Sequence, residues 1–396
     1  MKKITPTLFI VILFELMLGG GGRLTSYGSV SLRMILFGIA ILVTCIHVLR
    51  GEKISKEYWL ITILFAIVLA IGFLRGIAAG ASRTFWWEDV KPLSYFFMLP
   101  FFGFTIQNIS IVDATARSIR QAGIILSVLF ISALVLIHVE IIPFSVFYKT
   151  VIGTGEFFFR GELTFFYKGF IYLCIAFLFV HFSNVQHKHL VMALLAMAIL
   201  LSVTRGFLFA LTLTYAFYYF PNKAYFKSVP FIVLALVIVV FGQTAISRSS
   251  QVIARLTDAG RSAMYQRTDS NLLGDKSYAD RGRLQQIKEV VSQTTLSTSL
   301  LGHGFGMGIP SRPIHMEISY LEIFHKQGVI GLAFWAYLLW LLYQKYKNAQ
   351  GNLRDPFFFG SLFVYFQSLT NQYINNPIGL SLVLLSIVCL DQLKKE

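Results

Sequence analysis

Four ionisable side chains stand close together just before the last long apolar stretch of the chain. His315, Glu317, Glu322 and His325 lie in SRPIHMEISYLEIFH, and the apolar segment GVIGLAFWAYLLWLLY follows shortly after. An imidazole or a carboxylate can remove a proton from a reacting hydroxyl, and burial moves its pKa toward the working pH. The segment therefore predicts acid–base chemistry at the mouth of a membrane helix. The alternative is a helix end with solvated charges at the membrane interface.

A helix that begins near Pro313 would position these groups, because proline suits the first turn of a helix. On such a helix His315, Glu322 and His325 fall on one stripe, and Glu317 lies to one side. Ionisable groups at membrane depth are costly and usually functional. The spacing thus predicts a polar stripe that faces a wet cavity.

Arginines gather in the segments that we expect on the outer side of the membrane, whereas lysines dominate the inner loops. The planar guanidinium suits bidentate capture of phosphate or carboxylate. The set predicts an anionic ligand at the outer face, although any single arginine could instead bind a lipid head group or an aspartate. Its members are Arg23, Arg75, Arg83, Arg160, Arg205, Arg248, Arg255, Arg261, Arg267, Arg281, Arg283 and Arg312.

Other motifs carry weaker signals. Glu88 and Asp89 in RTFWWEDVKP could offer oxygen ligands to a divalent ion, but two adjacent carboxylates make a poor cage, and an interfacial tryptophan belt with charges is the favoured interpretation. Glycines in LLGHGFGMGIPSRP permit tight turns or close approach to a ligand, yet no P-loop follows. Zinc-ligand spacing and a G-x-S-x-G elbow are also missing. We expect neither a metal nor a cofactor.

Composition sets the fold class. Of 396 residues, 56% are hydrophobic and 13% are charged, whereas soluble domains carry about 25% charged residues. The apolar runs are continuous and do not alternate with period two, which predicts an all-α polytopic membrane protein rather than a barrel. Three cysteines inside apolar runs form no disulfide framework. The net charge of +15 is spread over loops, as membrane insertion requires, and predicts no nucleic-acid binding.

About twelve transmembrane helices are expected, because a span needs roughly 17–25 residues. The first is interpreted as a retained helix, since no small-residue cleavage site follows it. The segment 188–221 is divided at Arg205, within TRG, into two hinged helices. The expected spans are 4–19, 31–49, 58–74, 91–107, 121–141, 164–182, 188–204, 206–221, 229–246, 317–343, 356–373 and 377–391.

The positive-inside rule places the N-terminus in the cytoplasm and the long connection outside. Three regions follow: helices one to nine over 1–246, a long periplasmic loop with short helices over 247–316, and helices ten to twelve over 317–396. In that loop, RLQQIKEVV places Leu284, Ile287 and Val291 on one face, which suits the membrane surface or other helices.

Several segments together resemble a known family, the bacterial O-antigen and capsular polysaccharide polymerases of the Wzy type and the related O-antigen ligases. The segments are SVTRGFLFAL (202–211), RGRLQQIKEVV through LLGHGFGMG (281–308), EISYLEIFHKQGVIGL (317–332) and NQYINNPIGL (371–380). In order and expected topology, the resemblance covers roughly residues 150–391.

The resemblance favours a polymerase over a ligase. Ligases typically carry a histidine eleven residues before the first glycine of Gly-x-x-Gly; here that position is Glu317, and His315 lies two residues earlier. A transporter of lipid-linked sugar is a further alternative. It would place charged residues in many spans and break helices in corresponding halves, and the sequence has no such internal repeat.

The reaction implied by the resemblance is glycosyl transfer at the periplasmic face of the bacterial inner membrane. A polysaccharide on undecaprenyl pyrophosphate passes to the terminal sugar hydroxyl of a new lipid-linked repeat unit, without a metal. Glu317 is the first expected base, with His315 and His303 as alternatives. A chain-length regulator is an expected partner. The arginines expected to bind the leaving pyrophosphate are Arg205, Arg281, Arg283 and Arg160.

Overall fold

The computed structural model describes residues 4–27, 30–160, 164–220 and 276–394, and this part of the chain is mostly helical. By length and composition, four of its helices could cross a membrane: α2 (Leu32–Leu49), α3 (Lys56–Ala78), α6 (Ile109–His138) and α16 (Ser319–Asn348). Shorter apolar helices accompany them. The expected class, an all-α membrane protein, is confirmed in this coarse form.

The remaining elements are mostly short helices, with two small antiparallel hairpins among them. They are α1 (Ile4–Leu18), β1 (Ser26–Tyr27), β2 (Val30–Ser31), α4 (Arg83–Leu93), the 3₁₀-helix η1 (Ser94–Met98), α5 (Leu99–Thr105), α7 (Phe144–Ile152), β3 (Phe157–Arg160), β4 (Thr164–Tyr167), the 3₁₀-helix η2 (Lys168–Phe170), α8 (Ile171–Phe182), α9 (Lys188–Leu201), α10 (Arg205–Tyr219), α14 (Lys276–Gln293), α15 (Leu296–Leu301), α17 (Arg354–Gln367) and α18 (Pro377–Gln392).

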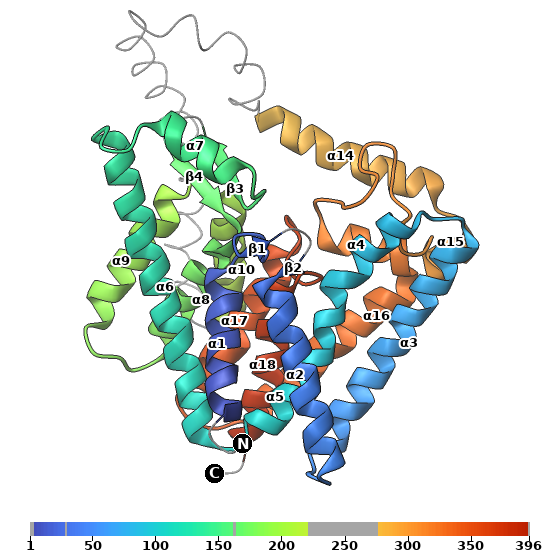
Figure 1. Ribbon diagram of the computed structural model, residues 1–396, viewed down its shortest axis with the longest axis horizontal. Helices are drawn as coiled ribbons and strands as arrows, with labels where there is room; N and C mark the ends of the chain where they lie inside the picture. The colour runs from blue at the N-terminus through green and yellow to red at the C-terminus, as the bar shows by residue number, and fades with distance from the viewer. Residues whose placement is uncertain (1–3, 28–29, 161–163, 221–275, 395–396) are drawn as a thin grey trace, which may run out of the picture.

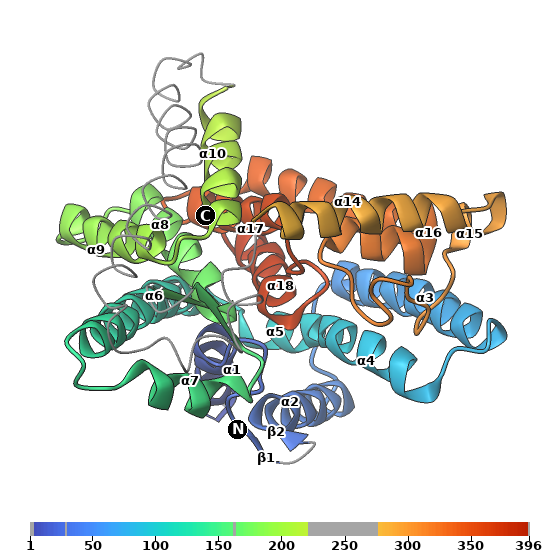
Figure 2. The ribbon, with the colours of Figure 1, turned by 90° about the horizontal axis from the view of Figure 1, so that it is seen from above.

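Helix α18 forms the centre of the molecule, and all but one of its sixteen residues are buried. It packs against α16, α17, α5 and η1. Seen from above, α6, α8 and α9 lie on one side of this centre and α3, α4 and α16 on the other (Figure 2). The start of α1 and the end of α18 lie at the same end of the bundle, and α14 lies across the opposite end (Figure 1).

Several expected helices match the observed ones closely, including the predicted division of 188–221. Helix α9 ends at Leu201 and α10 begins at Arg205. The expected span 121–141 is wrong at its start, because α6 begins at Ile109 and ends at His138. The expected span 229–246 and the loop residues up to 275 lie outside the described residues. The described part of that loop region contains the helices α14 and α15. Leu284, Ile287 and Val291 of α14 are exposed, so this apolar face is available to a membrane surface.

Two expected spans are divided differently. Residues 91–107 were expected to form one helix, but they belong to α4, η1 and α5. Pro92 and Pro100 stand in this segment, and a proline removes a helical N–H donor. Residues 164–182 begin with a strand, and α8 starts only at Ile171. The β3–β4 hairpin pairs Phe158 with Phe166 across the strands, a kind of aromatic pair that stabilises sheets.

The expected start of the helix near Pro313 is wrong. Residues 309–318 form a loop with a bridge between Ile309 and Arg312, and α16 begins at Ser319. Proline at a first turn is only a preference, and here a tertiary contact decides: the Ser319 N–H donates to the carbonyl of Ser368. His315 therefore does not share a helical stripe with Glu322.

The glycine-rich segment 302–308 closes against α3 and α16. Gly328 has φ 65° and interrupts α16, and there the carbonyls of His325 and Lys326 accept the N–H groups of His303 and Gly304 at 2.7 and 3.1 Å. A Cβ at Gly76 would stand 2.1 Å from the Phe305 carbonyl oxygen. These glycines permit backbone packing between distant segments.

We expect Gly76→Ala to lower stability by about 1–3 kcal/mol, because the added methyl would force α3 away from the Phe305 backbone. The matched control is Gly38→Ala, a helical glycine with no atom near its Cβ position, which should be neutral or gain about 0.5–1 kcal/mol. Thermal melting in detergent measures both. Equal melting temperatures for the two variants would contradict the packing argument.

Candidate active site

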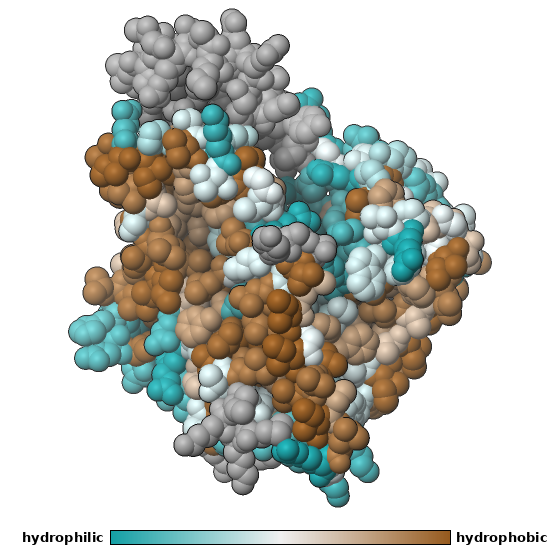
Figure 3. Space-filling model, in the orientation of Figure 1, coloured by the Kyte–Doolittle hydropathy of each residue, from teal (hydrophilic) through white to brown (hydrophobic). Residues whose placement is uncertain are grey.

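A polar cavity of about 680 Å³ opens in the half of the molecule that carries α14. Hydrophilic side chains gather in a hollow there, whereas the flank below it is largely hydrophobic (Figure 3). Segments distant in the chain line it: the turn after α1, α2, α4, the region around η2, the loop before α16, α16 itself and the loop before α18. Its ionisable lining residues are Arg23, Arg33, Glu88, Asp89, Lys91, Tyr95, Glu156, Lys168, His315, Glu322 and Lys326.

One wall is built around the ammonium group of Lys326. Its Nζ lies 2.6 Å from Asp89 Oδ1 and 2.6 Å from Glu322 Oε1, and all three side chains are buried. His315 Nδ1 is 3.3 Å from Glu322 Oε1 and 3.6 Å from Asp89 Oδ1. We call Asp89, His315, Glu322 and Lys326 the buried ion-pair cluster.

Backbone and amide donors complete the cluster. The Gly306 N–H donates to Asp89 Oδ2 at 2.7 Å, and Asn375 Nδ2 donates to Glu322 Oε2 at 2.7 Å. Gln372 donates to the same oxygen. Burial raises the pKa of Asp89 above its usual value, and this effect is opposed by the Lys326 charge and the Gly306 N–H. The cluster joins α4, α16 and the loop before α18.

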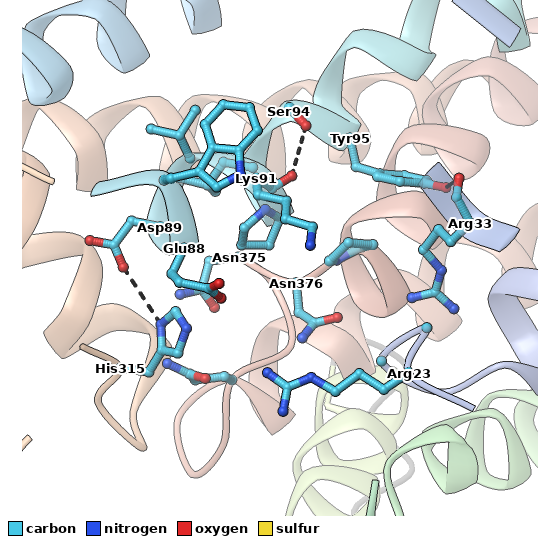
Figure 4. A pocket seen from close by; sticks show the side chains of 18 of the residues that line it. Arg23, Arg33, Glu88, Asp89, Lys91, Ser94, Tyr95, His315, Asn375 and Asn376 are labelled. Carbon is cyan, nitrogen blue, oxygen red and sulfur yellow. Dashed lines mark hydrogen bonds and ion pairs between the residues drawn. The ribbon is translucent and has the colours of Figure 1, made fainter. Parts of the chain in front are cut away.

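A divalent cation does not fit this cluster as it stands. Asp89, His315 and Glu322 bring ligand atoms within 4.8 Å of one another, a spacing that a metal could use. The Lys326 ammonium, however, already contacts both carboxylates, and a metal ion there would have to displace it. Glu88, the other carboxylate that the sequence offers as an oxygen ligand, points into the cavity and away from Asp89 (Figure 4).

Three further cations, which we call the cation wall, line the cavity outside this cluster: Arg23, Lys91 and Lys168. None of them forms a side-chain ion pair with another described residue. Arg33, by contrast, is buried against Glu15 with Nε 2.8 Å from Oε2. The Arg23 side chain reaches across the cavity floor toward the His315 side (Figure 4). This wall can attract an anion, because unpaired cations in a partly dry cleft act with little screening.

Glu156 holds the turn that presents Arg23. Its side chain is fully buried and accepts the N–H groups of Gly21 at 2.7 Å and Arg23 at 3.3 Å. A Cβ at Gly21 would stand 2.4 Å from Glu156 Oε1. The run of glycines after α1 therefore lets the backbone approach this carboxylate.

The structure places one of the three expected bases in the cavity. His315 lines it. Glu317 lies outside the lining, where it pairs with Arg312 and with Arg283 Nε at 3.2 Å. His303 stacks on His325 with ring centroids 4.3 Å apart. Its ring nitrogens lie 3.2 Å from the carbonyl oxygens of His325 and Gln293.

None of the four arginines expected to bind pyrophosphate lines the cavity. Arg205 begins α10 and has no polar side-chain partner among the described residues. Arg281 is exposed on α14, and Arg283 pairs with Glu317. Arg160 ends β3 opposite Thr164, and its side chain is outside the described part of the structure.

Sequence reasoning missed Lys91, Lys168 and Lys326. Bidentate capture of an anion favours arginine over lysine, and this preference assigns no role to these three lysines. The signal that could have found Lys326 is its spacing of four residues from Glu322, which places the two on one helix face.

The fold and the cavity define a class: a multi-pass helical membrane protein with a charged cavity toward one end of its helices. No protein-family model matches the chain. The chain is, however, 26% identical over 398 residues to an O-antigen polymerase from Shigella flexneri, a match that spans 97% of this chain and 94% of that protein. The resemblance to the Wzy-type O-antigen polymerases is thereby confirmed.

We expect Lys326→Met to destabilise the protein by about 3–5 kcal/mol, because two buried carboxylates would lose their shared cation. Adding Glu322→Gln to this variant should restore part of the loss. Lys347→Met, an exposed lysine on the same helix, should change stability by less than about 0.5 kcal/mol. Thermal melting of the purified variants checks this, and a Lys326→Met variant as stable as the control would refute the role of the cluster.

Proposed function

We propose that this protein is an O-antigen polymerase, a membrane glycosyltransferase that joins undecaprenyl-pyrophosphate-linked oligosaccharide repeat units into surface polysaccharide. The observation that carries the proposal is the match to an O-antigen polymerase across nearly the whole chain. That match favours a polymerase over the ligase and transporter alternatives, and the Glu317 position in the sequence separately favours a polymerase over a ligase. The lipid bilayer and the lipid-linked oligosaccharide are its partners, and a chain-length regulator remains an expected third.

We further propose that the chain crosses the bacterial inner membrane about twelve times, with the cavity facing the periplasm. Two features support this orientation. The start of α1 and the end of α18 lie together at the end of the bundle away from α14 (Figure 1), as an even number of spans requires. The lysine-rich loops, which the positive-inside rule assigns to the cytoplasm, are the loops expected at that same end.

The cavity supports glycosyl transfer through its two walls. In the reaction the bond from the anomeric carbon to the diphosphate oxygen breaks, and the acceptor hydroxyl oxygen bonds to that carbon. The hydroxyl proton passes to a base, and undecaprenyl diphosphate leaves. We assign the diphosphate to the wall of Arg23, Lys91 and Lys168, because fixed cations stabilise the charge that grows on the leaving group.

We assign the base to His315, one of the three expected candidates. Its Nδ1 faces Glu322 Oε1, and its other ring nitrogen has no partner among the described residues. A carboxylate that accepts from one ring nitrogen orients the ring and raises the basicity of the other. Glu317 is a weaker candidate, since two arginines already engage its carboxylate.

Comparing His315→Ala with Glu317→Gln tests this assignment. We expect His315→Ala to lower the rate of polymer formation at least about 100-fold, because a general base contributes that much or more. Glu317→Gln should lower the rate of polymer formation by less than about tenfold. The assay uses purified protein in nanodiscs, a lipid-linked repeat unit and excess chelator, with product length on a gel. The opposite ranking would return the role to Glu317, and dependence on added metal would refute a metal-free reaction.

The assignment of the diphosphate to these cations also predicts which alanine variants lose the most activity. Alanine substitutions of Arg23, Lys91 or Lys168 should each lower the rate about 100-fold, because each removes a cation from the leaving group. Arg205→Ala and Arg281→Ala should have smaller effects. Binding of undecaprenyl pyrophosphate to the same proteins gives the independent readout. If binding fails only in the Arg205 and Arg281 variants, the diphosphate lies where the sequence motifs had placed it.

A further inference from the structure

We propose that α4 carries a subsite for the sugars of the acceptor repeat unit, made of the Trp87 indole and the Glu88 carboxylate. The inference rests on the proposed function and adds what that function leaves open: how the acceptor is held for attack. Two independent observations support it, one on the carboxylates of the cavity and one on its aromatic side chains.

Glu88 is the cavity carboxylate that remains free to accept hydrogen bonds. Four carboxylates line the cavity: Glu88, Asp89, Glu156 and Glu322. Asp89 and Glu322 share the Lys326 ammonium, and Glu156 accepts two backbone N–H groups. Glu88 has no hydrogen-bond or ion-pair partner among the described residues. A half-buried carboxylate without donors in a polar cavity requires hydroxyl or water donors.

Trp87 is the aromatic side chain that the cavity leaves uncovered. Phe305 and Tyr95, which also line it, are 1% and 5% exposed, whereas Trp87 is 51% exposed. Phe37 stacks on Tyr95 with ring centroids 5.1 Å apart. The neighbouring Trp86 packs edge-on against Phe73 with ring centroids 4.8 Å apart. Trp87 contacts Trp86 edge-on with ring centroids 6.1 Å apart, and half of its surface remains exposed.

A pyranose ring matches this pair chemically. One face of such a ring presents C–H groups, which carry partial positive charge and can lie against the negative face of an indole. The ring edge presents hydroxyls, which can donate to a carboxylate that has no other donor. Trp87 and Glu88 both line the cavity from α4. Because consecutive residues of a helix do not face each other, the indole would hold the face of one sugar and the carboxylate would accept from hydroxyls of the same or the adjoining sugar.

The position of the pair fits the acceptor rather than the donor diphosphate. The Glu88 carboxylate lies in the cavity beside Asn375 and close to the His315 side, while Arg23 approaches from across the cavity (Figure 4). A sugar held by Glu88 would therefore present a hydroxyl toward the proposed base. The Glu88 charge makes this position less favourable for a diphosphate than positions near Arg23 and Lys168.

The test uses a free sugar as the probe. The repeat-unit oligosaccharide, cleaved from its lipid and freed of phosphate, is added to the nanodisc polymerisation assay as an inhibitor. It can occupy an acceptor sugar subsite but has no charge for the cation wall. We expect inhibition of the wild-type protein, with Ki about tenfold higher in Trp87→Ala and in Glu88→Gln.

Two further variants separate recognition from a structural effect. Trp87→Phe keeps an aromatic face and should restore Ki to within about threefold of wild type. Trp340→Ala removes a similarly exposed tryptophan, 55% exposed on α16 and outside the cavity lining, and should leave Ki unchanged. Glu88→Gln keeps the side-chain shape, so its Ki still tests the subsite even if a Trp87 variant folds poorly.

The outcomes of the inhibition assay distinguish failure of the subsite from failure of the proposed function. No inhibition of the wild type, or an unchanged Ki in both Trp87→Ala and Glu88→Gln, overturns the subsite and leaves Trp87 as an interfacial anchor. If the wild type makes no polymer in this assay, and transfers sugar only when a different lipid acceptor is added, the proposed function fails instead. If the wild type does make polymer but the Ki is unchanged in both variants, only the subsite is rejected and the proposed function stands.

Discussion

The ammonium group of Lys326 is the point on which the polar half of this molecule depends. It lies between two buried carboxylates, Asp89 of α4 and Glu322 of its own helix. Charges in a poorly solvated interior are tolerated only when paired and hydrogen-bonded. The cluster therefore fixes α4 against α16, and through Asn375 and Gln372 it also fixes the loop that leads into α18. Three segments that are far apart in the chain thereby form one wall of the cavity.

Close backbone contacts make this arrangement possible. The glycine-rich segment 302–308 inserts between α3 and the break in α16 at Gly328, where it satisfies carbonyl groups that the interrupted helix leaves free. The same segment supplies the Gly306 N–H to Asp89. The glycines thus act on the site indirectly, by letting the backbone come near enough to hold a carboxylate.

The resulting cavity separates its charges by function. In one part, two carboxylates share the Lys326 ammonium and an oriented imidazole lies at the edge; elsewhere Arg23, Lys91 and Lys168 line the cavity without a direct side-chain ion pair to another described residue. The proposed reaction needs both kinds of group, because a base must take the proton of the alcohol while cations stabilise the charge on the departing diphosphate. The ion pair of Arg33 with Glu15 shows the contrast: a cation used for packing is matched by its own carboxylate.

The sequence by itself determined what local composition controls. Continuous apolar runs predicted the helices, and the interruption at Arg205 predicted the division between α9 and α10, because hydrophobic length and backbone breaks are local properties. The motifs also carried the resemblance to the polymerases. Only the tertiary structure decided which charges meet. Asp89 and Lys326 form an ion pair although they are 237 residues apart. Glu317 lies outside the cavity lining, where it pairs with Arg283 and Arg312. Arg23 lines the cavity because Glu156 holds the turn on which it stands. Pairing between distant ionisable groups depends on how helices pack, and no local spacing encodes that.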